Sequence, residues 1–422
     1  MAQVIDRIVR SGGNAVLAIF SARVLGSADY GMLAYLLTVV GFASILSTLG
    51  LANFTLISFA RLPAEETDTW LSTLVILRQA GALAAVGGAM LFLATIRHAS
   101  VELVILGGMI ASSQLLQSLD CYESFYLARG QAGAVLLVRW FSFAMLGAAK
   151  IAACIWHAPL GIFALLAALD LGLYGATYLV LAPKNRPRLH WRQVRWSIMK
   201  EALGSCWPLA IASLTVLTYM RYDQFLISRY LGDRALGQYA VAVVVAELWN
   251  FVANALSVAF MPRLTAMLGN GGESKYSLFF GQLTRLAFWG SFSYSLAVFL
   301  LAEPIIRILY GSEFATAAST LRILCWTAPL IAVGILNAVW VVHHQIQSVW
   351  LFQTLIVATF SIISNQFVVH RFGVNGAALV LLASQLLACL LLNGFFKATQ
   401  ELFATQLKAI FNLGQSRPSN NA

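Results

Sequence analysis

Charged residues are scarce in this sequence. Only 10% of its 422 residues are Asp, Glu, Lys or Arg, 60% are apolar, and the mean hydropathy is +0.79. A soluble globular protein carries about 25% charged residues, which coat the surface that faces water. The longest polar interval here, roughly Pro183 to Glu201, is too short to bury a core of its own. The composition therefore excludes a soluble fold and predicts no separate soluble domain.

Cysteine and histidine patterns that bind metals are also missing. No two of the five cysteines have C-x-x-C spacing, and all lie in apolar stretches, where unpaired cysteines behave as small apolar side chains. His343 and His344 are adjacent on a predicted helix, so we expect their rings to point apart. We predict no disulfide, no metal site and no cofactor. The cysteines are Cys121, Cys154, Cys206, Cys325 and Cys389.

Two further absences narrow the function. The glycine-rich loop with a lysine that holds nucleotide phosphates is absent, which argues against an ATP-driven pump in this chain. No basic stripe with interleaved aromatic residues lies outside the apolar stretches. The formal net charge of +10 therefore does not indicate nucleic acid, because membrane proteins concentrate Lys and Arg on their cytoplasmic side.

Apolar stretches of about 20 residues, the length that spans a bilayer as a helix, recur from end to end. The predicted fold class is all-α: a polytopic membrane protein of about 12 transmembrane helices. Short turns join most of these helices, often with Gly or Pro. We place the helices at about 5–25, 31–58, 70–96, 102–128, 133–156, 159–182, 202–231, 237–266, 279–301, 317–342, 347–369 and 375–397.

The basic residues predict the orientation. With the N terminus in the cytoplasm, most Lys and Arg residues between the helices fall on the cytoplasmic side, including a cluster between 183 and 201. The outer side keeps fewer. The excess of basic residues inside predicts that both termini are cytoplasmic. The cluster is Lys184, Arg186, Arg188, Arg192, Arg195 and Lys200; the outer side keeps Arg23, Arg97, Arg229, Arg234, Arg307 and Arg371.

The chain contains an internal repeat. The pattern R-x-L-G with a second glycine five residues later begins at Arg23 and again at Arg229, an offset of 206 residues. It is typical of a tight turn between helices, because glycine tolerates positive φ. Two matched halves with even numbers of helices predict two pseudo-symmetric six-helix lobes around a substrate path. We place the lobes at 1–182 and 202–397, a cytoplasmic basic linker at 183–201 and a cytoplasmic tail at 398–422.

Six motifs in chain order resemble the Wzx-type polysaccharide flippases of the multidrug/oligosaccharidyl-lipid/polysaccharide exporter superfamily. The resemblance covers nearly the whole chain. One departure is that lipid II flippases of the superfamily usually add two helices, which we do not find. The motifs are the turn from Arg23 to Ala34, Leu49-Gly50-Leu51, Asp223 before the second turn, Pro262, the outer loop Leu309–Phe314, and Phe372–Ala378 before the last helix.

The resemblance implies a function and a location. A flippase of this type moves a polyprenyl-pyrophosphate-linked oligosaccharide, the repeat unit of an O-antigen, capsule or exopolysaccharide, from the cytoplasmic to the periplasmic leaflet of the inner membrane. It works by alternating access, with possible ion coupling and without covalent catalysis. The implied partners are the lipid-linked oligosaccharide, membrane lipids, a glycan polymerase and a chain-length regulator. We expect a monomer, because a two-lobed cavity fits in one chain.

Basic residues inside the spans are the candidates for binding the pyrophosphate, because an ionisable residue within the bilayer predicts a functional site. They are Arg78, Arg139, Lys150 and Arg221. Arginine's planar fork suits phosphate oxygens, which favours Arg78 and Arg139. The alternative is that these two arginines extend to the interface or pair with Asp120 or Glu123. Lys150 lies nearer the outer end, where extension to the interface is the competing interpretation.

A polar stripe adds further candidates. Glu247, Asn250, Asn254 and Ser257 are spaced i, i+3, i+7 and i+10 on the eighth span, so they share one helical face and line either a cavity or a helix contact. Glu247 and Asp223 are candidates for coupling to a proton or cation. The alternative for Asp223 is a local pair with Arg221 or a helix cap. Asp170, with Tyr174 and Thr177, makes a smaller stripe and is a third coupling candidate.

Two other functions compete. A cation-coupled exporter of small molecules on the same fold predicts an aromatic and acidic cavity, against which the intramembrane arginines speak. A membrane-embedded glycan polymerase or ligase needs a sizeable outer loop with catalytic acids and bases. The longest outer loop predicted here, about Ala302 to Ala317, holds no such set.

Overall fold

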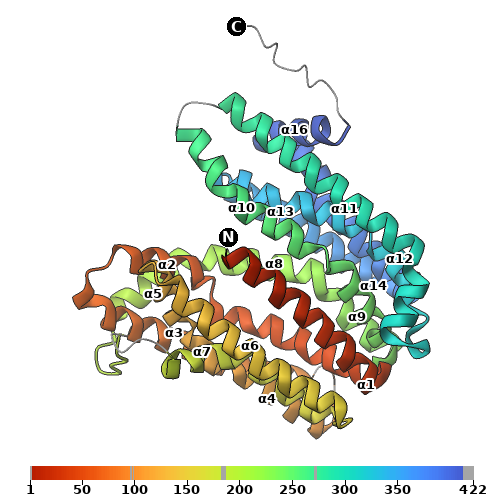
Figure 1. Ribbon diagram of the computed structural model, residues 1–422, viewed down its shortest axis with the longest axis horizontal. Helices are drawn as coiled ribbons and strands as arrows, with labels where there is room; N and C mark the ends of the chain where they lie inside the picture. The colour runs from red at the N-terminus through yellow and green to blue at the C-terminus, as the bar shows by residue number, and fades with distance from the viewer. Residues whose placement is uncertain (1, 96, 98, 182–186, 270–272, 412–422) are drawn as a thin grey trace. The chain divides into compact units, whose positions relative to one another are not determined.

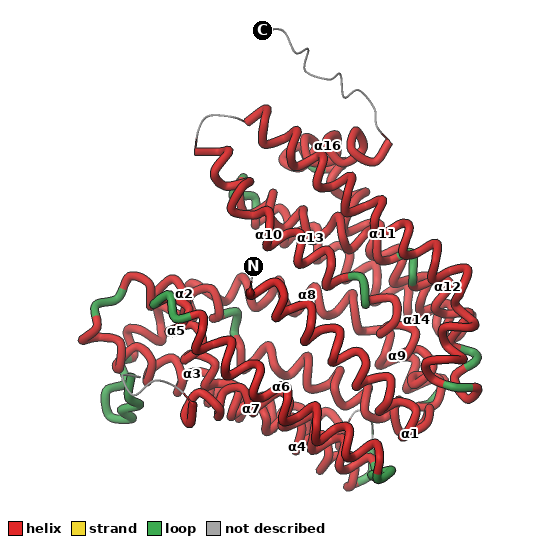
Figure 2. Tube along the Cα trace, viewed as in Figure 1, coloured by secondary structure: helices red, strands yellow, loops and turns green. Residues whose placement is uncertain are grey.

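The computed structural model describes residues 2–95, 97, 99–181, 187–269 and 273–411, and no strand is present among them. Nine helices in this part of the chain are long and apolar enough to cross a membrane, and the bent pair Ala317–Leu324 and Thr327–His343 adds a tenth. Two of the nine contain a non-helical glycine, Gly26 or Gly373, and each is therefore two helices merged across a kink. The predicted polytopic, all-α fold with about 12 spans is confirmed (Figures 1 and 2).

Contacts divide the chain into two compact units. The amino-terminal unit comprises residues 16–217 and 232–237; the carboxy-terminal unit comprises the described parts of 1–15, 218–231 and 238–422. The predicted lobe boundaries at 182 and 202 stay a prediction.

The amino-terminal unit contains most of α1 (Ala2–Thr48), the first part of α8 (Trp196–Leu231) and the helices between them. These are α2 (Leu51–Arg61), α3 (Thr67–Thr95), α4 (Val101–Gln117), α5 (Cys121–Ala128), α6 (Ala132–Ile155) and α7 (Leu160–Leu181), with 3-10 turns at Ala64–Glu66 and Ser118–Asp120.

The carboxy-terminal unit contains most of α9 (Asp233–Glu247) and all later helices. These are α10 (Asn250–Gly269), α11 (Glu273–Tyr310), α12 (Ala317–Leu324), α13 (Thr327–His343), α14 (Gln347–Leu386), α15 (Leu392–Phe395) and α16 (Gln400–Phe411). Short turns lie at Ser312–Phe314, Leu387–Leu391 (π-helical) and Lys397–Thr399.

Several predicted spans differ from the observed helices. The predicted helix 31–58 is broken at Leu49 and Gly50, both with positive φ, and Gly50 lies against the backbone of α8 where a Cβ would meet Leu209 and Ala210. The predicted helix 237–266 is broken between Glu247 and Asn250. The predicted helix 279–301 was too short: α11 continues through Pro304 to Tyr310, so the outer loop predicted at Ala302–Ala317 is largely helix.

The two copies of the repeated turn contact each other reciprocally within the amino-terminal unit. A Cβ on Gly31 would collide with the carbonyl oxygen of Asp233, and a Cβ on Gly237 would collide with that of Ser27. Both pairs obey the repeat offset of 206 residues, because Ser27 corresponds to Asp233 as Gly31 corresponds to Gly237. Each repeat therefore offers a glycine to the carbonyl of the other, a two-fold contact that no larger residue permits.

Arg97 holds the second turn to the first. Its guanidinium donates to both carboxylate oxygens of Asp233, at 2.6 and 2.7 Å, and lies over the ring of Tyr35 at 3.8 Å. Arg97 and Asp233 had no predicted connection, since one follows α3 and the other begins α9. One guanidinium nitrogen thus binds both carboxylate oxygens, and this ion pair stacked on an aromatic ring fixes the position of the turn.

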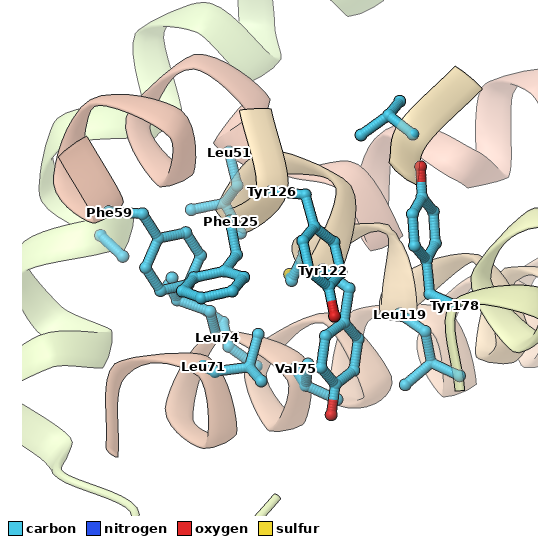
Figure 3. Packing of buried hydrophobic residues seen from close by; sticks show 14 of the residues in the cluster. Leu51, Phe59, Leu71, Leu74, Val75, Leu119, Tyr122, Phe125, Tyr126 and Tyr178 are labelled. Atoms are coloured by element: carbon cyan, nitrogen blue, oxygen red, sulfur yellow. The ribbon is translucent and has the colours of Figure 1, made fainter. Parts of the chain in front are cut away.

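The core of the amino-terminal unit is an aromatic cluster at the end where α2, α3 and α5 meet (Figure 3). Phe59 and Phe125 pack edge to face with ring centroids 5.8 Å apart, and Tyr126 stacks on Tyr178 at 6.0 Å. These side chains are almost completely buried. Aromatic pairs contribute about 0.5–1.5 kcal/mol beyond the area that they bury, so this cluster orders the helices around it.

The last described helix, α16, belongs to the fold of the carboxy-terminal unit. Gln406 is fully buried and donates to Oδ1 of Asn337 at 2.6 Å and to the carbonyl of Cys389 at 3.3 Å. That carbonyl also accepts from Asn337 and Asn393 at 2.8 and 3.1 Å. Cys389 lies in the π-helical turn, where the regular backbone hydrogen bonds are interrupted. Side-chain amides therefore donate to its carbonyl oxygen in their place.

Replacing Gly31 or Gly237 by Ala is expected to destabilise the purified protein by about 1–3 kcal/mol, because the new methyl group collides with backbone. The control is Gly87→Ala, since Gly87 lies within α3 with open space around its Cβ position. We expect that control to be neutral or stabilising by up to about 1 kcal/mol. Thermal unfolding in detergent measures both, and equal behaviour of the three variants would refute the reciprocal contact.

Replacing Gln406 by Ala is expected to cost about 1–3 kcal/mol, because buried partners on three other segments lose their hydrogen bonds. Gln400→Ala serves as the matched control, since Gln400 is an exposed glutamine of the same helix. The melting temperatures of the two variants provide the comparison. An unchanged melting temperature for Gln406→Ala would show that α16 is not anchored by this network.

Candidate functional site

Each basic candidate in the spans is paired with a carboxylate from another segment. The pairs are Arg78–Asp120, Arg139–Glu123, Lys150–Asp170 and Arg221–Glu247. The first three lie within the amino-terminal unit and the fourth within the carboxy-terminal unit. An isolated charge in hydrocarbon is costly, so pairing is how such residues are accommodated. Pairing with Asp120 and Glu123 was the alternative considered for Arg78 and Arg139, and the structure places them so.

Arg78 is the most enclosed of the four. Its side chain is 4% exposed, and its guanidinium binds both oxygens of Asp120, at 3.1 Å for Nη2 to Oδ2. It also contacts the sulfur of Cys121 at 3.8 Å. Asp120, on the turn after α4, covers the guanidinium and is itself 36% exposed. In this conformation Arg78 joins α3 to the end of α4 and does not face open space.

Arg139 is more accessible. It extends from α6 to Glu123 on α5, and the two side chains are 25% and 22% exposed. The second oxygen of Glu123 accepts from the hydroxyl of Tyr178 on α7 at 3.1 Å. Because Tyr178 belongs to the aromatic core, the carboxylate is held in one position while its arginine partner remains partly open.

The stripe on α7 faces α6. Lys150 donates to Asp170 at 2.7 Å, and the hydroxyls of Ser142 and Thr177 lie 3.1 Å apart. Lys150 and Asp170 are 17% and 25% exposed. Asp170 and Thr177 therefore serve a helix contact in this conformation, whatever further role Asp170 has.

A cavity of about 440 Å³ lies in the carboxy-terminal unit and contains three of the predicted residues. Glu247, Asn250 and Asn254 line it together with Ser11 near the start of α1. The predicted stripe was drawn on a continuous helix, whereas α9 ends at Glu247 and α10 begins at Asn250. The break keeps these three side chains on the cavity, while Ser257 is not among the lining residues. The remaining walls are Ala15, Val244, Leu248 and Phe251.

Arg221 is not among the lining residues, but it pairs with Glu247, which is. Its Nη2 donates to both oxygens of Glu247, at 2.9 and 3.1 Å, and the two side chains are 27% and 28% exposed. The amide of Asn254 donates to the carbonyl of Asn250 at 2.8 Å, and the buried Oδ1 of Asn250 has no hydrogen-bond partner among the described residues. The cavity thus offers a carboxylate and side-chain amides to a polar ligand, and an arginine binds that carboxylate.

Asp223 is placed differently from Glu247. It is 2% exposed, accepts from the hydroxyl of Tyr239 on α9, and accepts from the backbone N–H of Gln224 at 2.8 Å. Tyr239 was not predicted as a partner, because nothing in the sequence relates it to Asp223. The proposed coupling pair, Asp223 and Glu247, consists of two carboxylates with separate partners on the same two helices.

The prediction that the rings of His343 and His344 point apart was wrong. Their ring centroids are 4.6 Å apart, and His344 stacks on Trp340 at 4.2 Å. The reason is that α13 ends at His343, so His344 turns back over the last helical turn. Among the described residues, no three His, Cys, Asp or Glu side chains gather as a metal site would require.

The fold is similar to that of known membrane transporters. An inward-facing MATE family multidrug transporter of the MOP superfamily has a TM-score of 0.69, with 14% identity over 96% of this chain and 99% of that chain. The lipid II flippase MurJ, in an inward closed conformation, has a TM-score of 0.68, with 12% identity over 97% and 89%. A Vibrio cholerae MATE transporter has a TM-score of 0.64, with 13% identity over 97% and 95%. These similarities define the fold class.

The sequence defines the family. A family described as "Polysaccharide biosynthesis protein" matches residues 20–319. Since this is more than half of the chain, the protein belongs to the polysaccharide biosynthesis protein family. The resemblance to polysaccharide flippases of the exporter superfamily, predicted from the motifs, is confirmed. No curated protein matches at a significant level.

The Arg221–Glu247 pair can be tested by stability alone. Removing one partner, as Arg221→Met or Glu247→Leu, leaves a partly buried charge unpaired and is expected to cost up to about 3–5 kcal/mol. The double variant R221M/E247L removes both charges and is expected to recover most of that loss. Melting temperatures in detergent give the comparison, and additive losses in the double variant would show that the two residues do not interact.

Proposed function

We propose that this protein flips a polyprenyl-pyrophosphate-linked oligosaccharide, the repeat unit of an O-antigen, capsule or exopolysaccharide, from the cytoplasmic to the periplasmic leaflet of the inner membrane. Both termini are then cytoplasmic, as the distribution of basic residues predicts. The family and the multi-pass fold support a membrane transporter of the flippase class. The cavity of the carboxy-terminal unit, lined by Glu247 and two asparagines, with Arg221 paired to that glutamate, is the observation that carries the substrate proposal.

The chemistry of the substrate explains why such a cavity is needed. Each sugar hydroxyl moved into hydrocarbon without a partner costs about 2–7 kcal/mol, and a phosphate charge costs far more. Asn250 and Asn254 supply amide donors and acceptors, and Ser11 supplies a hydroxyl. A volume of about 440 Å³ falls in the range of about 300–1,000 Å³ that holds small ligands, so this conformation accommodates part of the head group.

Exchange of ion-pair partners provides a route for the pyrophosphate. Arg221 and Arg139 are each about one-quarter exposed and already bind a carboxylate. A pyrophosphate that approaches either arginine offers negatively charged oxygens, at least as many charges as the carboxylate, and suits the planar guanidinium, so it substitutes for the carboxylate without leaving the arginine unpaired. Arg78, with 4% exposure, takes this role only after Asp120 moves.

Release of the carboxylate suggests how ions are coupled. Glu247 loses its partner when Arg221 binds phosphate, and a proton or cation then neutralises it. Asp223 and Asp170 are the other coupling candidates, with Tyr239 and Lys150 as their present partners. A membrane potential supplies about 2.3 kcal/mol per charge per 100 mV, which is enough to drive a cycle that moves one cation.

A cation-coupled exporter of small molecules is the second candidate. The cavity carries an acidic residue, Glu247, beside an aromatic one, Phe251, which is the lining that such an exporter uses for cationic substrates. The arginine paired with Glu247 favours the anionic substrate. A glycan polymerase or ligase is less well supported, since α11 occupies most of the outer loop that such an enzyme would need. The polymerase and chain-length regulator remain proposed partners, and the monomer remains the proposed state.

The proposal predicts where substrate accumulates when the gene is deleted. We expect the lipid-linked oligosaccharide to build up on the inner leaflet, inaccessible to a glycan-labelling probe added on the periplasmic side. The wild-type gene should restore labelling, whereas R221M/E247L should not, although it folds. The matched control E303Q/R322Q alters an exposed ion pair of the same unit and should restore labelling fully.

The contrary outcomes are equally clear. Normal surface glycan and no accumulation after deletion, in a host without a second flippase, would overturn the proposed function and favour the small-molecule exporter. If R221M/E247L restored labelling to the wild-type level, the proposed flipping would stand, but the assignment of this cavity to the substrate would be rejected.

A further inference from the structure

Residues 187–200, the juxtamembrane segment, join α7 to α8 and belong to the amino-terminal unit. The segment contains Arg188, Arg192, Arg195 and Lys200, and no acidic residue. Residues 187–195 precede the membrane-spanning helix α8, and residues 196–200 form its first turn, since α8 starts at Trp196. A lipid head-group region therefore lies beside it whichever way the protein is oriented.

Hydrogen bonds from the helices fix the backbone of this segment. The hydroxyl of Tyr122 donates to the carbonyl of Pro187 at 3.2 Å. The backbone N–H of Arg188 donates to Asp68 at 3.0 Å, and that of His190 donates to Ser72 at 2.8 Å. The N–H of Arg195 donates to Thr73 at 3.2 Å. The first turns of α3 thus hold the segment by its main chain and not by its arginine side chains.

The side chains that this leaves outside are basic and aromatic. Arg188, Arg192 and Arg195 are exposed, and they make no ion pair among the described residues. Trp191 and Trp196 are 64% and 72% exposed. Asp68 is the acidic residue in contact with the segment, and its oxygens face the N–H of Arg188 and, at 3.5 Å, the ring of His190. Among the described residues, the side chains of these three arginines therefore have no carboxylate partner.

We propose that this surface binds anionic phospholipid head groups of the adjacent leaflet. Tryptophan side chains settle at the level of the head groups, and clustered basic residues next to a membrane helix attract anionic lipids. Two tryptophans set the depth, and three arginines offer bidentate contacts to phosphodiester oxygens. The inference is independent of the substrate proposed above, because it uses no residue of the cavity.

Native mass spectrometry of the full-length protein in detergent tests this surface, with equal amounts of phosphatidylglycerol and phosphatidylcholine added. We expect wild-type protein to retain phosphatidylglycerol preferentially. The variant R188Q/R192Q/R195Q should bind it at least about tenfold more weakly, since each basic residue near an anionic surface contributes about fivefold. W191A/W196A should reduce the binding of both lipids, because the tryptophans position the protein at the level of the head groups and do not distinguish charged from uncharged lipids.

The matched control is R234Q/R307Q/R371Q, which removes the same charge from three exposed arginines outside the segment. It should keep the wild-type preference. An equal loss of phosphatidylglycerol binding in both triple variants would show that only net charge matters and would overturn the proposed site. An unchanged preference in R188Q/R192Q/R195Q would also overturn it. Unaltered melting temperatures exclude misfolding.

Inorganic pyrophosphate distinguishes the source of the phosphate. In the proposed site the arginines bind the lipid phosphate and the tryptophans insert at the level of the head groups. Pyrophosphate competes only for the arginines, so at millimolar concentration it should leave most phosphatidylglycerol bound. Complete displacement at that concentration would assign the arginines to a soluble or substrate pyrophosphate and overturn the lipid proposal.

Discussion

Pairing of charges between neighbouring segments is the constraint on which the two units depend. Hydrocarbon offers no water to solvate an ion, so each of the four basic candidates, Arg78, Arg139, Lys150 and Arg221, takes a carboxylate from a second segment. These pairs connect α3 to the end of α4, α6 to α5 and to α7, and α8 to α9. Their short side-chain reach sets the register of the helices, while apolar packing, as around Tyr178, supplies the bulk of the contact.

The same pairs make transport of an anion physically reasonable. An arginine held by a carboxylate is stable while the cavity is empty, and a phosphate with matching geometry can replace that carboxylate when substrate arrives. Arg221 meets this requirement best, since it adjoins a cavity with amide groups and is partly exposed. Arg78 meets it least, because Asp120 encloses it. In the proposed function, stability and substrate binding therefore use one set of residues in turn.

The repeated turn shows how duplication becomes structure. Gly31 lies against the carbonyl of Asp233 in the second copy, and Gly237 lies against the carbonyl of Ser27 in the first. The two copies therefore fit only if both glycines are kept. The Arg97–Asp233 pair has no counterpart in this exchange and makes the contact asymmetric. A sequence repeat that predicts a tight turn thus also encodes the partner of that turn.

The sequence by itself determined the fold class and singled out the candidate site residues. In long apolar runs a helix pairs all backbone hydrogen-bonding groups within lipid. Charges within these runs are rare because placing them in the bilayer costs free energy, so they stand out as functional candidates. The tertiary structure decided which carboxylate each arginine binds, which asparagines reach a cavity and where helices break, as at Gly50 and after Glu247. Partners such as Tyr239 for Asp223, or Gln406 for Asn337, depend on the packing of segments far apart in sequence, which periodicity does not encode.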